Sequence, residues 1–217
     1  MHNIEELLRL PSPAPRPQSL AFDGSLLWMG SLQTERLYAI DPVHWTVVEE
    51  ADVPGRPFGL TVVGDDLRVL CGEGEQDHRV IRRFIPGHGI KSAWQIACPD
   101  DTGSQLGYDG ERLYVSQWHN QRILSIDENG TVGSTISVPH GICGQVVVDG
   151  RFYLVTTDDE ASTDYFLTRV DARNGVPLSE DLARIPFQAR ALAFDGVKFW
   201  TNHRESAQIV AFARPDA

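Results

Sequence analysis

The chain has 217 residues, of which 41% are hydrophobic and 23% are charged, and this balance excludes an intrinsically disordered protein. A chain of this length buries enough surface to fold without disulfides or a structural metal, which excludes the small cross-linked folds. The formal net charge is -11. Because an acidic protein repels both phosphate backbones and anionic lipids, we expect neither nucleic acid nor a membrane as a partner.

The N-terminal segment carries acidic residues where a signal peptide carries basic ones. No apolar run reaches the roughly 20 residues of a membrane span. The three cysteines, Cys71, Cys98 and Cys143, have no paired spacing, which is typical of proteins from a reducing compartment. Together these features predict a cytoplasmic protein.

A short apolar pattern that ends in a turn glycine recurs five times, first as Leu20–Gly24 and last as Leu192–Gly196. The spacings between successive turn glycines are 40, 46, 40 and 46 residues, and the two ends of the chain together supply a fifth period of 45. The period therefore divides the whole chain into five units. The turn glycines are Gly24, Gly64, Gly110, Gly150 and Gly196.

Each unit contains four short stretches with strand character. In the first unit they are Leu20–Phe22, Leu26–Met29, Arg36–Asp41 and Thr46–Val48. The Asp-Gly pair between the first two stretches predicts a hairpin, because glycine accepts the positive φ that a tight turn requires. A four-stranded meander of about 40 to 45 residues is the repeat of a β-propeller blade.

The last unit lacks a fourth strand, because only Phe199–Thr201 and Ile209–Phe212 follow its turn before the chain ends. An open strand edge is an aggregation hazard, and Glu6–Leu10 is long and apolar enough to cover it. We therefore predict an all-β fold: a single domain over residues 1–217 that forms a five-bladed β-propeller of four-stranded antiparallel blades. The N-terminal strand, within residues 5–11, closes the ring.

The five strand-turn-strand units, and Arg56–Leu67 in particular, resemble the five-bladed propellers of the glutamine cyclotransferase-like group. More loosely they are similar to the propellers of the gluconolactonase and NHL-repeat families. The resemblance covers nearly the whole chain and rests on residues that build blades, so it implies the architecture rather than an activity.

In a propeller, the loops between second and third strands and the segments that enter each blade gather on one face around the central channel. Ionisable side chains of both signs in such a concave mouth are typical of a small-molecule site, although a solvated rim of polar loops is the alternative. The candidate side chains on this face are Gln18, Arg56, Phe58, Glu73, Gln105, Trp118, His119, His140, Asp158, Arg190, Asn202, His203 and Arg204.

His119 and His203 hold the same register in the third and fifth units and form the main catalytic hypothesis. They suit a general acid and base, or two ligands of a divalent metal ion in the channel that Glu73 or Asp158 completes. Glu73, which lies between two glycines, also suits a general base. The alternative is that the loop histidines bind backbone carbonyls and that the glycines only set turns.

Arg56, Arg190 and Arg204 are cations on an acidic chain, so on the channel face they would attract a carboxylate or another small anion. Salt bridges to nearby acids are the other explanation for them. Trp118, next to His119, would form an apolar wall of the same pocket.

The loops of the five units differ in kind, whereas the strands and turns repeat. This asymmetry favours one shared central site over five equivalent ones. We expect a small-molecule enzyme, with acid–base chemistry of the hydrolase, lyase or cyclase type, acting on a polar or anionic substrate. The alternative is a propeller that binds a ligand or a protein without catalysis, as a lectin or scaffold does.

Overall fold

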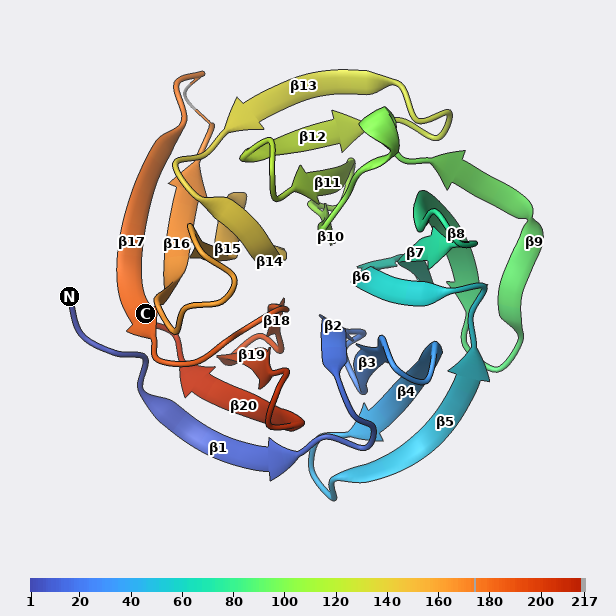
Figure 1. The fold of residues 1–217 in the computed structure, drawn as a ribbon, viewed down its shortest axis with the longest axis horizontal. Coiled ribbons are helices and arrows are strands. Elements are labelled where there is room, and N and C mark those ends of the chain that lie inside the picture. Colours follow the sequence, from blue (N-terminus) through green and yellow to red (C-terminus); the bar gives the residue numbers. More distant parts are fainter. Residues whose placement is uncertain (174, 216–217) are drawn as a thin grey trace.

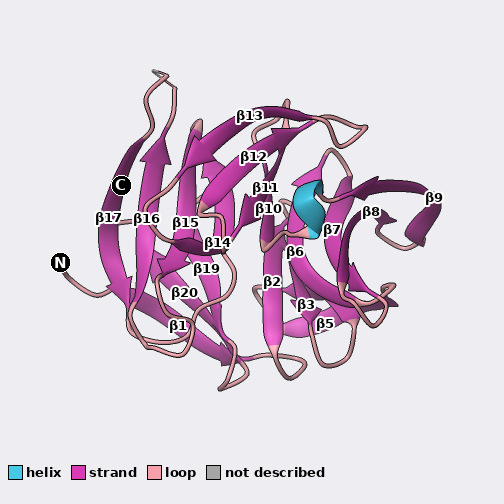
Figure 2. Cartoon of the chain, turned by 45° about the horizontal axis from the view of Figure 1, so that its top comes forward, coloured by secondary structure: helices cyan, strands magenta, loops and turns pink. Residues whose placement is uncertain are grey.

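The computed structural model describes residues 1–173 and 175–215 and shows five four-stranded sheets arranged in a ring around a central axis (Figure 1). Neighbouring strands in every sheet are antiparallel. Almost all of the ribbon is strand or connecting loop, and a 3₁₀ turn, η1 (Pro99–Asp101), connects blades 2 and 3 (Figure 2). No helix in the described ranges is long and apolar enough to cross a bilayer.

The first three blades follow one another along the chain. Blade 1 consists of β2 (Pro17–Phe22), β3 (Leu27–Ser31), β4 (Arg36–Asp41) and β5 (Thr46–Asp52). Blade 2 consists of β6 (Arg56–Val63), β7 (Asp66–Glu73), β8 (His78–Ile85) and β9 (Gly89–Ala97). Blade 3 consists of β10 (Gln105–Tyr108), β11 (Leu113–Gln117), β12 (Arg122–Ile126) and β13 (Val132–Ser137).

The last two blades complete the ring, and the fifth combines both ends of the chain. Blade 4 consists of β14 (Gly141–Val148), β15 (Arg151–Thr157), β16 (Tyr165–Asp171) and β17 (Leu178–Ile185). Blade 5 consists of β18 (Ala193–Phe194), β19 (Lys198–His203), β20 (Gln208–Ala213) and, as its outer strand, β1 (Glu6–Pro11). The predicted five blades and their closure by the N-terminal strand are confirmed.

The Asp-Gly turns between first and second strands do more than reverse the chain. In blade 1, Asp23 accepts hydrogen bonds from the backbone N–H groups of Ser25 and Leu26 and, at 2.7 Å, from the indole Nε1 of Trp28. Asp195 binds Trp200 in the same way in blade 5. Burial opposes the charge of Asp195, but hydrogen bonds from Lys198 and the backbone outweigh it and lower its pKa.

The hydrophobic core lies between neighbouring blades. In four of the five blades, an aromatic residue on the second strand packs against the next blade. This residue faces the next blade and contacts an aromatic ring there, with ring centroids 4.9 to 6.0 Å apart. In blade 2 the equivalent position, opposite Thr61, is Arg68. The ring pairs are Trp28 with Phe84, Tyr114 with Phe152, Tyr153 with Phe199 and Trp200 with Trp45.

Small residues on the inner strands allow the blades to approach one another around the channel. A Cβ atom on Gly59 would lie 2.8 Å from the Cα of Gln105, and one on Gly144 would lie 2.6 Å from the carbonyl carbon of Ala191. Both contacts are with backbone, which cannot move aside. A side chain at either glycine would therefore widen the ring.

Candidate functional site

A cavity of about 270 Å³ lies at the channel mouth, on the face where the loops between second and third strands gather. The entry segments of all five blades, three of these loops and the strand β8 contribute residues to it. The lining residues are Gln18, Phe58, Arg79, Thr102, Gly103, Ser104, Trp118, His119, Ile142, Cys143, Glu160, Arg190 and Arg204. The structure therefore brings together six of the thirteen side chains that the sequence predicts for this face.

Gln105, another predicted site residue, is 1% exposed and lies beneath the cavity rather than in its wall. Its amide Nε2 lies 2.9 Å from the carbonyl oxygen of Phe58, 2.7 Å from that of Arg190 and 3.3 Å from that of Gln18. These three residues enter three different blades and place their side chains in the cavity. Gln105 is thus a positioning residue that ties the cavity wall together from below.

Two arginines stack on Phe58, one in the cavity wall and one at its rim. The guanidinium of Arg79 lies 3.6 Å from the ring centroid of Phe58, and that of Arg56 lies 5.8 Å from the same ring. Both arginines pair with Asp77, at 3.0 and 2.8 Å respectively. Arg79 also donates from Nε to the carbonyl of Gly103 at 3.1 Å, so its plane is fixed. Arg56 lies outside the wall, 44% exposed at the rim.

Arg190 is a buried cation with incomplete pairing. Its side chain is 3% exposed, and its Nη2 lies 3.5 Å from a carboxylate oxygen of Glu160. Nη1 approaches the sulfur of Cys143 at 3.2 Å, and Nε has no hydrogen-bond partner in the described ranges. Burial disfavours the charged guanidinium and lowers its pKa. Electrostatic interactions with Cys143, Tyr165 and Glu160 are together larger than this effect, so the pKa of Arg190 is raised. The guanidinium therefore stays charged.

Cys143 is an inert part of the wall. Burial raises its pKa to about 11, against a smaller opposing effect of Arg190. The thiol is therefore protonated near neutral pH, and the same holds for Cys71 and Cys98, whose pKa burial raises to about 12. The structure assigns no nucleophilic thiolate to the cavity.

Arg204 forms the third cationic corner. Its Nη1 donates to the side-chain oxygen of Gln18 at 3.1 Å, and its Nε lies 3.4 Å from Glu205. Burial and the neighbouring Arg190 lower its pKa, which shows that the two guanidinium groups repel each other across the cavity. Three arginines against Glu160 give the wall an excess of positive charge on a protein of net charge -11. Asn202 is fully buried behind the wall. Its side-chain oxygen accepts a hydrogen bond from the backbone N–H of Arg190 at 3.1 Å.

His119 is the histidine that lines the cavity. It lies in the loop between β11 and β12, is exposed, and meets the ring of Trp118 edge-on at 4.8 Å. Trp118 is half-buried, and its indole Nε1 has no hydrogen-bond partner among the residues that the structure describes. An accessible imidazole beside an apolar wall and three cations can exchange a proton with a bound molecule.

His203 lies apart from His119. It ends β19 with its ring stacked on Phe187 at 5.1 Å and with Nε2 3.4 Å from the hydroxyl of Ser206. Burial lowers its pKa, and the positive charge of Arg9 on β1 adds to that effect. The side chain therefore lies beside Phe187 and near Arg9 of the ring-closing strand, and it is not among the residues that line the cavity.

Three other predicted residues also lie outside the cavity wall. Glu73 accepts two hydrogen bonds from Arg82, both at 2.7 Å, which neutralises its carboxylate. His140 lies between two acids, with Nδ1 2.9 Å from Asp158 and Nε2 3.5 Å from Asp181. These pairs belong to the rim.

The proposed metal ligands do not converge. His119 lines the cavity, whereas His203, Glu73 and Asp158 have the separate partners described above. Across residues 1–173 and 175–215, no three side chains of His, Cys, Asp or Glu come together in a metal-binding arrangement.

Arg79 and Glu160 also line the cavity, but the sequence does not predict these two charged residues as part of the site. Arg79 belongs to β8, the third strand of its blade, whereas the prediction covers only loops and blade-entry segments. Glu160 stands in an acidic run that is typical of a solvated loop. The alternation of β8 offers a signal for Arg79, since Arg79 and Ile81 share a sheet face and Ile81 is buried toward blade 3.

A ring of five four-stranded antiparallel sheets around a channel, with a polar cavity at one mouth, defines a five-bladed β-propeller. No family model matches the chain, and neither does any curated protein.

Solved structures do resemble it. Hydrazine synthase from Kuenenia stuttgartiensis has a TM-score of 0.56 at 15% identity, and the match covers 87% of this chain and 62% of that one. Glutaminyl cyclase from Myxococcus xanthus has 0.52 at 14%, with 70% and 93% covered. BamB from Moraxella catarrhalis has 0.52 at 12%, with 97% and 100% covered. At these identities the likeness shows the propeller fold, which enzymes and non-enzymes share, and it agrees with the resemblance to the cyclotransferase-like propellers.

Proposed function

We propose that the channel-mouth cavity binds a small anionic molecule and that His119 transfers a proton to or from it, as in hydrolase, lyase or cyclase chemistry. The observation that carries this proposal is the convergence of Arg79, Arg190 and Arg204 on one concave wall. Burying a guanidinium costs several kcal/mol unless its charge is balanced. Glu160, at 3.5 Å and 51% exposed, balances Arg190 poorly.

The arginines would fix the ligand, and two titratable groups would remain for chemistry. His119 is exposed and lies against Trp118, so it can face a ligand held by Arg204 and Arg190. Glu160 contacts Arg190 at 3.5 Å, so its carboxylate suits the role of a base or an electrostatic partner. The excess of positive charge in the wall favours a substrate with at least one carboxylate or phosphate group.

Calorimetric titration with malonate and with inorganic phosphate tests the binding part. Arg204→Met should weaken the binding of the anion that binds best by about tenfold or more, because a charge-assisted hydrogen bond contributes about 1.5–3 kcal/mol. Arg36→Met is the matched control, since Arg36 pairs with Glu50 and Asp52 on the outside of blade 1. Equal affinities in wild type and Arg204→Met would contradict the proposal.

Turnover tests the catalytic part. We expect the wild type to convert at least one member of a panel of small esters, lactones and glutaminyl amides, and His119→Ala to lose that turnover while it still binds the anion. His44→Ala is the control, because His44 is 74% exposed and pairs with Asp41 away from the channel. His203→Ala tests the second histidine of the catalytic pair that the sequence predicts. Binding without any turnover would instead support a non-catalytic ligand-binding propeller.

A further inference from the structure

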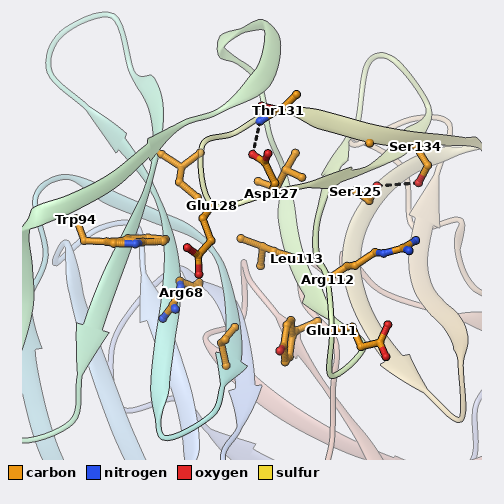
Figure 3. Close-up of a pocket in the computed structure, with 15 residues that line it drawn as sticks. Arg68, Trp94, Glu111, Arg112, Leu113, Ser125, Asp127, Glu128, Thr131 and Ser134 are labelled. Atoms are coloured by element: carbon orange, nitrogen blue, oxygen red, sulfur yellow. Dashed lines mark hydrogen bonds between the residues drawn. The ribbon is translucent and has the colours of Figure 1, made fainter.

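A second, larger hollow lies between blades 2 and 3, near the turns that join first and second strands (Figure 3). Its volume is about 590 Å³, and β6, β7, β9 and blade 3 supply its walls. Figure 3 shows Arg68 and Trp94 on one side and Leu113, Ser125 and Asp127 on the other. We call this hollow the inter-blade cleft.

The cleft exists because blade 2 departs from the repeat. Trp28, Tyr114, Tyr153 and Trp200 each fill the gap to the next blade with an aromatic ring, as described above. At the equivalent position blade 2 has Arg68, whose side chain lies over the indole of Trp94 in its own blade, 4.6 Å from the ring centroid. No aromatic side chain therefore closes the gap to blade 3 from β7.

Trp94 reaches the cleft through an irregularity in β9. The pairing of β8 with β9 runs regularly to Arg82 opposite Gln95 and resumes only at Phe84 opposite Ile90. A single residue of β8 thus faces four of β9, and this bulge turns Trp94 toward β7. Bulges of this kind often re-aim a side chain at a site.

Arg68 is half-buried, and its charge is not balanced by an ion pair. In the described ranges it makes one long hydrogen bond, 3.5 Å from Nη1 to the carbonyl of Leu67, and pairs with no carboxylate. Asp66, the acid closest to it in sequence, pairs with Arg83 instead. Burial and the charge of Arg83 lower the pKa of Arg68, while Asp66 and Glu128 act in the opposite direction. Its Nε and Nη2 groups remain available as donors.

The remaining walls set the rest of the chemistry. Val63, Ile96, Leu113 and Ile126 make one part of the cleft apolar. Asp127 lies on the blade 3 side, held by backbone N–H groups of Asn129 and Thr131, and these hydrogen bonds lower its pKa. A fixed carboxylate there repels a second negative charge on a ligand.

We propose that the inter-blade cleft binds a small monocarboxylate with an apolar or aromatic body. The carboxylate accepts hydrogen bonds from the guanidinium of Arg68, which Trp94 holds flat, and the apolar body lies against Leu113 and Ile126. Bidentate pairing of this kind is a preferred geometry of arginine with carboxylates. Figure 3 shows the carboxylate of Glu128 directed toward Arg68, so a ligand carboxylate takes its place there, and the negative charges of Glu111, Asp127 and Glu128 select against dicarboxylates and phosphates.

Calorimetric titration of the whole protein with phenylacetate, phenylacetamide and phenylsuccinate tests the proposal. Phenylacetate should bind with a Kd below about 10 mM and at least about tenfold more tightly than its neutral isostere phenylacetamide or the dicarboxylate. Arg68→Met should abolish that preference, and Arg112→Met, at the exposed rim of the same cleft, should change the affinity less than about twofold.

Arg68→Trp is the structural counterpart, because it restores the aromatic residue that the other four blades have at this position. The variant should fold, show a raised Tm and lose phenylacetate binding, whereas Arg204→Met at the channel mouth should keep it. Equal binding of phenylacetate and phenylacetamide, an unchanged affinity in folded Arg68→Met, or no binding below about 10 mM would each overturn the proposal. Because the channel mouth also attracts carboxylates, titration of Arg204→Met separates phenylacetate binding in the cleft from binding at the mouth, and Arg68→Met tests the cleft alone.

Discussion

The channel-mouth cavity and the inter-blade cleft both present an arginine stacked on an aromatic ring, but they arise in different ways. At the mouth, Arg79 lies over Phe58 and is also fixed by Asp77 and a backbone carbonyl. In the cleft, Arg68 lies over Trp94 with no carboxylate partner in the described chain. The mouth is formed largely by loops that differ between blades. The cleft arises because one residue in the repeated strands, Arg68, departs from the pattern of the other blades.

A repeat fold thus has two sources of binding capacity, its loops and its inner strands. Loops at the channel mouth can change without disturbing the strands, so charged groups from several blades accumulate there. A residue on the inner strands is shared with the packing of the next blade, so a change there opens a gap. Repeat positions that break the pattern are therefore as informative as the variable loops.

The largest effect should come from making blade 1 resemble blade 2. Trp28→Arg removes the ring contact with Phe84 and the hydrogen bond to Asp23. We expect the free energy of unfolding to fall by about 3–5 kcal/mol, as for other large losses of buried aromatic volume. Urea titration followed by circular dichroism measures it. A loss below about 1 kcal/mol would contradict the packing role of this position.

Replacement of Gln105 should weaken the mouth and leave the cleft intact. Gln105→Leu leaves the carbonyl groups of Gln18, Phe58 and Arg190 without their common donor, and we expect a loss of about 2–3 kcal/mol in urea unfolding. Anion affinity at the mouth should fall, and phenylacetate affinity in the cleft should not.

Gln145→Leu is the matched control for Gln105→Leu. Gln145, on the next inner strand, is also buried, but both polar atoms of its amide lack partners in the described ranges. Its replacement by an apolar residue of similar size should be neutral or slightly stabilising. Equal losses in the two variants would show that channel filling, and not the hydrogen bonds of Gln105, holds the mouth together.

The smallest effect concerns His203, which lies outside both sites. Its pKa is lowered from 6.5 in the folded state, so the unfolded chain binds more protons as the pH falls below about 6.5. The free energy of unfolding should therefore decrease with falling pH in that range. His203→Gln should lose this part of the pH dependence, as measured by Tm between pH 7 and about 5. An identical profile in the variant would contradict the burial of the imidazole.

The fold could be predicted almost completely from the sequence, because each blade repeats a short signal with a physical cause. The Asp-Gly turn is required by the hairpin, and the missing strand of the last unit is supplied by β1, as predicted. The site could be predicted only in part. Loop position alone does not tell whether a side chain points to the axis, like His119, or toward the outer strand, like His203.

Pairing is the other property that the sequence does not contain. Glu73 stands between glycines in a predicted loop, yet Arg82 from the next strand reaches back and neutralises it. Gln105 faces the channel as expected, but its amide binds backbone carbonyls of three other blades. Both outcomes depend on distances between segments far apart in the chain, which spacing along one blade does not determine.

Closure of the ring by β1 has a consequence for the order in which the protein can form during synthesis. Arg9 hydrogen-bonds Gln208, a partner 199 residues later in the chain, so β1 pairs with a strand that is synthesised long after it. Blades 1 to 4 can each assemble as they emerge, whereas Glu6–Pro11 stays unpaired until β20 has been translated. Completion of the fifth blade therefore waits for the synthesis of β20, and the folding rate should be limited by this long-range pairing.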